Sequence, residues 1–400
     1  AIEEIVVTAD LRQENAMHLA SSLTVVTEDV IRSRAAQHFE DIIQAIPNVN
    51  YAAGSNRARF FQIRGIGERS QFINPVNPSV GVLIDDVDFS GTGTVATMLD
   101  VAQVEVLRGP QGTRYGANAL GGLINISTNE PDESMLLKLQ AGFAEYGTTT
   151  RGLIANTPLS DTLRARLAMQ THKSDGYIKN DFLDVDDTNG RDEKTLRLKL
   201  AWQANDNWQV DFTLANVDID NSYDAFSLDN TRHTLSDEPG FDRQDSTYVA
   251  VKSLWELDTV YIELLLNGAE SDIGYGYDED WSFTGIHPWS YTSTDHYLRE
   301  KKTKSVEIRL LSNEQSRLFN DSSDWIMGFY KLQSDESLER IYTFANRFAS
   351  NYDFDTLAVF GQIDTQLSGN LMLSAGFRFE ERETRYNDSA EVEFSPDDAM

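Results

Sequence analysis

The chain has 400 residues, of which 34 are Lys or Arg and 64 are Asp or Glu, so its formal net charge is −30. This acidity argues against nucleic acid as a partner, because the phosphates would be repelled. The absence of Cys excludes a disulfide framework and thiolate chemistry, and no apolar run reaches the roughly eighteen residues of a transmembrane helix.

The opening residues AIEEIVV lack an initiator Met and a signal peptide, which is typical of a processed, exported chain. A β-prone hexamer at a terminus can add as a strand to the sheet of a partner. Here the hexamer consists of Glu4, Ile5, Val6, Val7, Thr8 and Ala9. The polar residues 10–18 are predicted to form a mobile tether.

Short strands and small helices alternate up to about residue 129, which predicts an α+β globule. Strands are expected over residues 23–26, 49–51, 61–67 and 80–87. Helices are expected from residue 28, with Thr27 as the cap, and over residues 39–46, where Pro47 stops the helix.

The most distinctive stretch is residues 99–131, LDVAQVEVLRGPQGTRYGANALGGLINISTNEP. Residues 101–107 and 123–127 have strand character, and a dense set of turn residues separates them. Glycine permits positive φ and proline fixes φ, so the pattern predicts a tight, defined chain reversal. No Gly-Lys-Ser/Thr follows the glycines, which excludes a phosphate-binding P-loop.

This stretch resembles the end of the plug domain of TonB-dependent outer-membrane receptors, through EVLRGPQGT, YGANA and GGLINI. Residues 61–67, FQIRGIG, resemble another strand of that plug. The plug motif residues that match are Arg64, Gly65, Arg108, Gly109, Pro110, Gly112, Gly116, Asn118, Gly121 and Gly122. The family usually has Asp-Gly where this chain has Asp85-Asp86, a departure that concerns turn geometry.

From residue 135 onward the apolar residues recur with a period of two. One example sets Leu196, Leu198, Leu200 and Trp202 against Arg197 and Lys199, and another sets Val306, Ile308 and Leu310 against Glu307 and Arg309. Such alternation over about ten residues is the pattern of a transmembrane β-barrel.

Loop lengths and aromatic residues also favour a barrel. Short connections are expected near residues 159–162, 204–207, 257–258 and 367–370, and long polar ones over 175–192, 220–244, 274–302 and 339–352. Aromatic residues near strand ends would form the interfacial girdles: Trp202, Trp208, Trp255, Tyr261, Trp325 and Tyr330.

About eleven strands are expected between residues 135 and 386, whereas the family barrel has twenty-two antiparallel strands around the plug. Because an open strand edge is prohibitive in lipid, we expect the natural protein to continue past residue 400. The resemblance thus implies three parts: residues 1–18 as TonB box and flexible tether, 19–131 as plug domain, and 132–400 as the first half of a membrane β-barrel.

No catalytic constellation or metal-ligand spacing is recognised among the six His residues, so we expect neither an enzyme nor a resident cofactor or metal. The acidic run 181–190 departs from the EF-hand spacing and is interpreted as a solvated loop. Whether such loops bridge to lipopolysaccharide phosphates through divalent cations is left open as a hypothesis.

The resemblance implies active import across the bacterial outer membrane by a monomeric barrel in lipid and lipopolysaccharide. Residues 4–9 would pair with TonB in the periplasm, and the plug's outer loops would bind the substrate, by default an Fe³⁺ chelate such as a ferric siderophore. Candidate substrate contacts are Arg57, Arg59, Arg69, Gln71, Phe72, Asn74, Asn77, Ser90 and Thr92.

Several alternatives stay open at this stage. The arginines 57, 59 and 64 could simply pair with acidic lumen residues such as Glu307 and Glu380. The cargo could be oligosaccharide, cobalamin or haem. From other functional classes, a passive porin or a secreted β-rich protein would show the same strand alternation.

Overall fold

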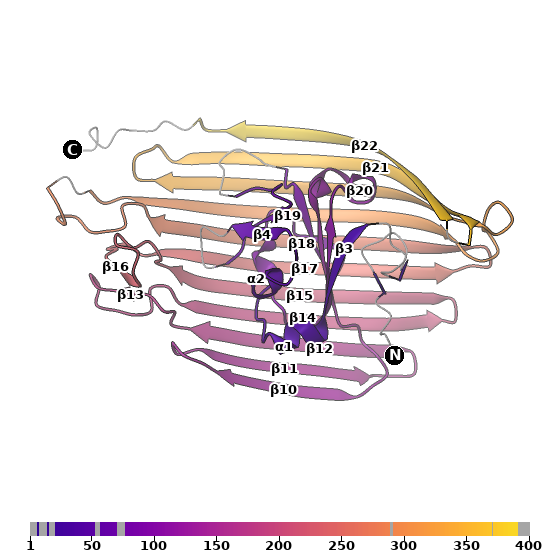
Figure 1. Ribbon diagram of the computed structural model, residues 1–400, viewed down its shortest axis with the longest axis horizontal. Coiled ribbons are helices and arrows are strands. Elements are labelled where there is room, and N and C mark those ends of the chain that lie inside the picture. Colours follow the sequence, from indigo (N-terminus) through magenta and orange to yellow (C-terminus); the bar gives the residue numbers. More distant parts are fainter. Residues whose placement is uncertain are drawn as a thin grey trace.

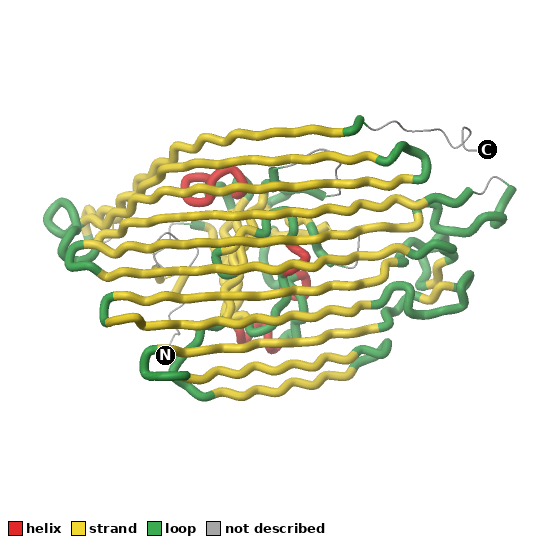
Figure 2. The backbone as a smooth tube through the Cα atoms, turned by 180° about the vertical axis from the view of Figure 1, so that it is seen from behind, coloured by secondary structure: helices red, strands yellow, loops and turns green. Residues whose placement is uncertain are grey.

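The computed structural model describes residues 6–7, 14–15, 21–52, 57–69, 77–288, 291–369 and 371–390. It consists of a small N-terminal domain, called the plug below, and a sheet of eleven antiparallel strands, called the wall. The plug lies across one face of the wall in Figure 1, and Figure 2 shows the wall from its other face. No helix in these ranges is long and apolar enough to cross a membrane.

The plug is built on a five-stranded sheet with the order β3-β8-β9-β6-β7. These strands are β3 (Ser22–Thr27), β6 (Val80–Ile84), β7 (Val87–Asp88), β8 (Val101–Arg108) and β9 (Gly122–Thr128), and a separate hairpin joins β4 (Val49–Ala52) to β5 (Phe60–Ile63). The helices are α1 (Glu28–Ser33), α2 (Glu40–Ile43) and α3 (Gly112–Tyr115), with short 3₁₀ turns η1 (Gly93–Val95) and η2 (Gly116–Ala119).

The wall strands pair with their neighbours in chain order. They are β10 (Leu136–Phe143), β11 (Thr149–Pro158), β12 (Leu163–Ser174), β14 (Arg191–Asn205), β15 (Trp208–Tyr223), β17 (Gly240–Glu256), β18 (Val260–Asp278), β19 (Thr294–Ser312), β20 (Ser323–Tyr342), β21 (Phe348–Ser368) and β22 (Leu371–Asp388). The expectation of about eleven strands is confirmed. Two short strands, β13 (Lys179–Asn180) and β16 (His233–Thr234), pair with each other in the loops at one end.

Three details of the plug differ from the sequence prediction. Thr27 stands at the N-cap of α1, but its side chain makes no capping hydrogen bond. The second helix, α2, spans only Glu40–Ile43 of the expected residues 39–46. The strand expected over residues 80–87 is broken at Asp85 and Asp86, whose φ angles of 48° and 68° form the β6–β7 turn.

The period-two pattern separates the two faces of the wall. Leu196, Ile308 and Leu310 are exposed on the outer face. On the opposite face Arg197 and Lys199 are buried and reach atoms of the plug. The polar positions of the alternation therefore serve as the contact surface for the plug.

The two ends of the wall carry connections of different length, as Figure 1 shows. Residues 175–190, 224–239 and 279–293 form long connections at the end that carries β13 and β16. At the other end, residues 313–322 form a connection longer than its neighbours, which the sequence reading did not anticipate. Conversely, most of the long loop expected over 339–352 is paired strand, and only residues 343–347 connect β20 to β21.

Tryptophans form a band on the outer face near the ends with short connections. Trp208 lies directly opposite Trp255 across the β15–β17 pair, and their rings stack with centroids 5.9 Å apart. Trp202 lies 5.7 Å from Trp208. Amphipathic rings at this position suit a lipid–water boundary. The girdle assignment was wrong for Tyr261 and Tyr330, which pack against a buried cluster of Leu311, Ile326 and Phe360.

A large hydrophobic cluster joins the plug to the wall. Plug residues such as Phe39, Ile42 and Ile124 are fully buried, and Val217 of β15 and Tyr248 of β17 belong to the same cluster. Phe89 of the plug meets Tyr248 edge-on, with ring centroids 5.2 Å apart. Apolar burial therefore stabilises the docked arrangement as well as the plug itself.

Candidate functional site

The glycine-rich motif builds the close contacts that hold the plug together. The peptide N–H groups of Gly109 and Gln111 donate to the carbonyl oxygens of Gly121 (3.1 Å) and Ala119 (2.8 Å), which closes the β8–β9 connection. Gly122 has a φ of 151°, and a Cβ atom there would overlap the carbonyl oxygen of Leu107. Only glycine fits this approach of the two strands.

Other motif residues tie the plug to its surroundings. The Arg108 guanidinium donates to the carbonyl oxygens of Pro47 (3.1 Å) and Leu23 (3.3 Å), and Asn118 donates to Asp88 (3.3 Å). Arg64 has a φ of 55°, and Gly65 follows it with a φ of 82°. Gly116 lies so close to Glu380 of β22 that a Cβ atom would collide with that carboxylate. Pro110 lies in the connection between β8 and α3, and Gly112 is the first residue of α3.

A buried charge cluster anchors the plug to the wall. Glu193 of β14 accepts a hydrogen bond from Arg57 (3.2 Å) and contacts the His38 ring nitrogen at 2.6 Å. Arg57 also donates to Glu40 (2.8 Å), and Asn221 donates to Glu193 (3.0 Å). Burial alone would lower the pKa of Arg57, but Glu40 and Glu193 raise it above its ordinary value.

A second anchor lies at the Asp85 turn. The Asp85 carboxylate accepts hydrogen bonds from Lys199 (3.1 Å) and from the Thr128 hydroxyl (3.0 Å), and Arg197 lies 3.7 Å away. Burial alone would raise the pKa of Asp85, but Lys199 and Arg197 hold it below its ordinary value. Nearby, Arg166 of β12 holds Asp100 of the plug with a hydrogen bond of 2.6 Å.

The structure places the candidate substrate residues in three groups. Arg57 and Arg59 are buried, and Arg59 pairs with Asp242 of β17. Ser90 and Thr92 are also buried, and their backbone oxygens accept from Lys301 (2.8 Å) and Gln244 (3.4 Å) of the wall. Arg69 and Asn77 are exposed, and Gln71, Phe72 and Asn74 lie outside the described residues.

Two of the plug arginines do form ion pairs with the wall, as one alternative expected, but their partners differ from the expected ones. Arg57 and Arg59 do pair with lumen-face acids, yet these acids are Glu193 and Asp242, which the sequence reading did not single out. The acids named there have neighbours of their own, because Glu307 pairs with Arg309 and Glu380 with Arg378. In this conformation Arg57 is a plug–wall contact rather than an exposed group.

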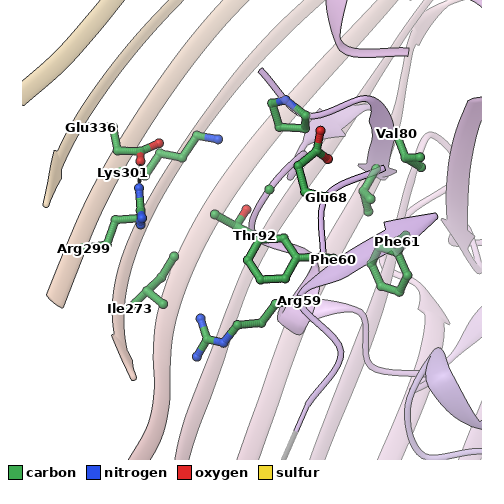
Figure 3. A pocket seen from close by; sticks show the side chains of 13 residues that line it. Arg59, Phe60, Phe61, Glu68, Val80, Thr92, Ile273, Arg299, Lys301 and Glu336 are labelled. Carbon is green, nitrogen blue, oxygen red and sulfur yellow. Dashed lines mark hydrogen bonds and ion pairs between the residues drawn. The ribbon is translucent and has the colours of Figure 1, made fainter. Parts of the chain in front are cut away.

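A small, solvent-open cavity lies between the plug and the wall. Figure 3 shows Arg59, Phe60 and Glu68 of the plug facing Ile273, Lys301 and the Arg299–Glu336 ion pair of the wall. Thr92 lines the same cavity. The wall residues come from the halves of β18, β19 and β20 that lie toward the long connections.

Sequence reasoning missed an aromatic group on the wall at that same end. The Tyr275 ring lies 5.8 Å from Tyr223, 5.6 Å from Tyr277 and 6.2 Å from Tyr297. The guanidinium of Arg340 lies 5.3 Å from the centre of the Tyr297 ring, and that of Arg59 lies 5.8 Å from the centre of Tyr275. The period-two spacing of tyrosines in GYGYD was the signal that could have identified it.

Of the N-terminal hexamer, the structure describes only two residues. These form β1 (Val6–Val7), which pairs antiparallel with β2 (Glu14–Asn15), so the expected tether is paired at that point. The Val7 side chain is fully buried in a small cluster with Leu107 and Leu123. Glu4, Ile5, Thr8 and Ala9 lie outside the described residues.

Comparison with known proteins identifies the plug and the overall arrangement. Residues 15–123 match the TonB-dependent Receptor Plug Domain model. The pesticin receptor of Yersinia enterocolitica is 23% identical over 390 residues, which cover 92% of this chain and 54% of the relative. The vitamin B12 transporter BtuB of Vibrio vulnificus is 25% identical over 229 residues, or 55% of this chain and 36% of the transporter.

Solved structures share the fold. The ferric yersiniabactin uptake receptor FyuA of Yersinia pestis superposes with a TM-score of 0.80 at 21% identity, over 92% of this chain and 58% of that one. The ferripyoverdine receptor of Pseudomonas aeruginosa gives 0.77 at 14% identity, over 98% and 55%. The chain spans about half the length of the curated receptors that match along most of it. The chain carries the TonB-dependent receptor plug domain over residues 15–123, and it shares with the solved receptors the fold of that plug docked against eleven antiparallel strands.

Proposed function

We propose that this chain forms part of a receptor that binds a ferric siderophore at its outer face and imports it with energy supplied through TonB. The observation that carries the proposal is the combination of tyrosines and arginines beside the cavity above the plug. Arginine attracts anionic chelates, and aromatic rings stack on planar ligand groups.

The docked plug favours gated import over passive diffusion. Buried pairs such as Arg57–Glu193 and Lys199–Asp85 join it to the wall, and a shared core surrounds them. Undocking would expose the apolar side chains of that shared core to water, and their burial is worth about 25 cal/mol per Å². Spontaneous undocking would therefore be rare, and an external source of work is needed to open a path.

The N-terminal hexamer is the proposed handle for that work. A short β-prone segment can be captured by strand addition. In the described part, Val7 is buried against the plug, so TonB would have to engage the segment after it separates from Leu107 and Leu123. Relatives named as siderophore and vitamin B12 receptors support the transport class, and the cargo is the finer part of the proposal.

The test is growth and uptake in a deletion strain that carries the full-length receptor or a variant without residues 4–9. We expect the receptor to restore uptake of one radiolabelled ferric siderophore, and we expect the deletion variant to bind that siderophore without importing it. Cobalamin, haem and an oligosaccharide form parallel arms. Unchanged uptake by the deletion variant would refute the role of TonB, and rescue in a non-iron arm alone would refute the siderophore.

A further inference from the structure

Two of the long connections at the outer end of the wall bring three carboxylates together. Asp237 precedes β17, Asp278 ends β18, and Asp280 follows it. One oxygen atom from each carboxylate lies within 4.8 Å of the other two. No ion pair with Lys, Arg or His is found for any of the three among the residues that the structure places.

The free oxygens of the cluster are buried and accept no hydrogen bond. Asp278 is 6% exposed, and its Oδ1 atom accepts from the peptide N–H groups of Asp280 and Trp281, both at 3.1 Å. Its Oδ2 atom has no donor, and neither does Asp237 Oδ1 nor Asp280 Oδ2. The backbone thus aims one oxygen of Asp278 into the cluster and leaves it unsatisfied.

A neutral group at the same place is unsatisfied too. Ser236 is 1% exposed, and its hydroxyl faces the Asp278 carboxylate without making a hydrogen bond of normal geometry to any described group. Ser236 and Asp278 line one small cavity, together with Trp281. A buried hydroxyl without a hydrogen bond can act as an oxygen ligand for a cation. The Ser236 hydroxyl is an observation separate from the three carboxylates.

Holding three ionised carboxylates this close together is costly without a cation, and one of them, Asp278, is buried while Asp237 and Asp280 are half-buried. Burial of an unpaired charge is expensive, and like charges at this separation repel. Ca²⁺ takes six to eight oxygen ligands at about 2.3–2.6 Å, so two ligands on opposite sides of the ion lie about 4.6–5.2 Å apart. Three oxygens that all lie within 4.8 Å of one another can therefore contact one Ca²⁺ ion.

We propose that Asp237, Asp278 and Asp280, with the Ser236 hydroxyl, form a Ca²⁺ site that clamps the connections 224–239 and 279–293 together. The two connections already touch, because the peptide N–H of Asp237 donates to the carbonyl oxygen of Ser282 (3.2 Å). Trp281 stacks on Phe226 with ring centroids 4.8 Å apart, which extends the same contact. The bound ion would fix the outer rim of the tyrosine group that includes Tyr277.

The test uses full-length receptor in detergent, stripped with a chelator and titrated with CaCl₂ by calorimetry. We expect one site with a Kd between about 10⁻⁴ and 10⁻³ M, which is the range of extracellular calcium modules. Terbium should replace Ca²⁺ and show luminescence sensitised by Trp281. MgCl₂ should bind at least tenfold more weakly.

The Kd for Ca²⁺ should rise at least tenfold in the variant D278N/D280N and several-fold in S236A. The matched control is D186N/D187N, in the exposed acidic run of the neighbouring connection, which should bind as the parent does. Folding of every variant is checked by the heat-dependent gel mobility of the barrel.

Limited proteolysis of the two connections separates a metal site from a structural cluster. In chelator, D278N/D280N should be cut more slowly than the parent, because the mutation removes repulsion. In Ca²⁺ only the parent should become protected. Absence of calorimetric binding at 10 mM CaCl₂, or equal loss in D186N/D187N, would overturn the site.

Discussion

Individual buried carboxylates decide how the plug is held. Glu193 forms hydrogen bonds with Arg57, His38 and Asn221, and Asp242 forms an ion pair with Arg59. Each acid is on a wall strand, and each arginine is on the segment just before β5. A buried ion pair is valuable here because removal of one partner leaves the other charge uncompensated.

Replacement of Glu193 by Gln should weaken docking of the plug by about 3–5 kcal/mol, because Arg57 and His38 lose their shared anion. Amide exchange in β8 and β9, measured by mass spectrometry in detergent, should accelerate by two orders of magnitude or more. The control is E145Q, in the exposed connection between β10 and β11, which should exchange as the parent does. Equal protection in E193Q and the parent would contradict the anchor role.

Asp85 should make docking sensitive to acid. Burial alone would raise its folded pKa, but Lys199 and Arg197 favour the carboxylate and hold that pKa below the ordinary value of an aspartate. A depressed pKa contributes stability that is present above the unfolded value of about 3.9 and is lost as the pH falls through the folded pKa. As the pH is lowered from 5 to 2, the Tm of the parent should fall more steeply than the Tm of D85N, because the amide that replaces the carboxylate in this variant takes up no proton. Parallel curves would refute this contribution.

At the scale of elements, the glycine-rich connection is more important for its backbone than for its side chains. Gly122 brings β9 against the Leu107 carbonyl, whereas Gly112 begins α3 with open space around its Cα. The same residue type therefore serves two purposes within one motif. The glycine pattern in the sequence alone does not distinguish the two purposes.

The variants G122A and G112A make a matched pair. G122A should destabilise the plug by more than about 2 kcal/mol, because the added methyl overlaps backbone and the φ of 151° is unfavourable for alanine. G112A should be neutral or slightly stabilising, since alanine favours a helix. Thermal unfolding of both variants checks this, and similar losses would show that the close approach is not the cause.

At the scale of the whole molecule, transport requires the plug to move relative to the wall. Thr97 of the plug and Thr195 of β14 are buried, with their hydroxyl oxygens 3.5 Å apart. The chain has no Cys, so an introduced pair would report on this contact alone.

The double variant T97C/T195C should form a disulfide that locks the plug in place. Oxidised receptor should bind the siderophore and fail to import it, and a reductant should restore uptake measured with radioactive iron. The single variants T97C and T195C serve as controls and should import under both conditions. Normal import by the oxidised double variant, with the crosslink verified by mass spectrometry, would show that this contact stays closed during transport.

Much of the architecture is determined by local sequence. The period-two pattern of residues such as Leu196 and Arg197 specified strands with an apolar and a polar face, because successive side chains point to opposite faces. Gly109, Gly116 and Gly122 specified the tight reversal, because the positive φ values they adopt are unfavourable for other residues. These signals lie within a few residues of one another, and so they can be read without the fold.

The partners of the buried charges were decided only by the tertiary structure. Arg57 and Glu193 are 136 residues apart, and their meeting depends on how the plug is seated against β14. The same is true of Tyr330. The sequence predicted it at the lipid boundary, but in the structure its ring packs against the buried cluster that contains Phe360. Strand spacing reports which face a side chain occupies, whereas three-dimensional packing selects the group that it meets there.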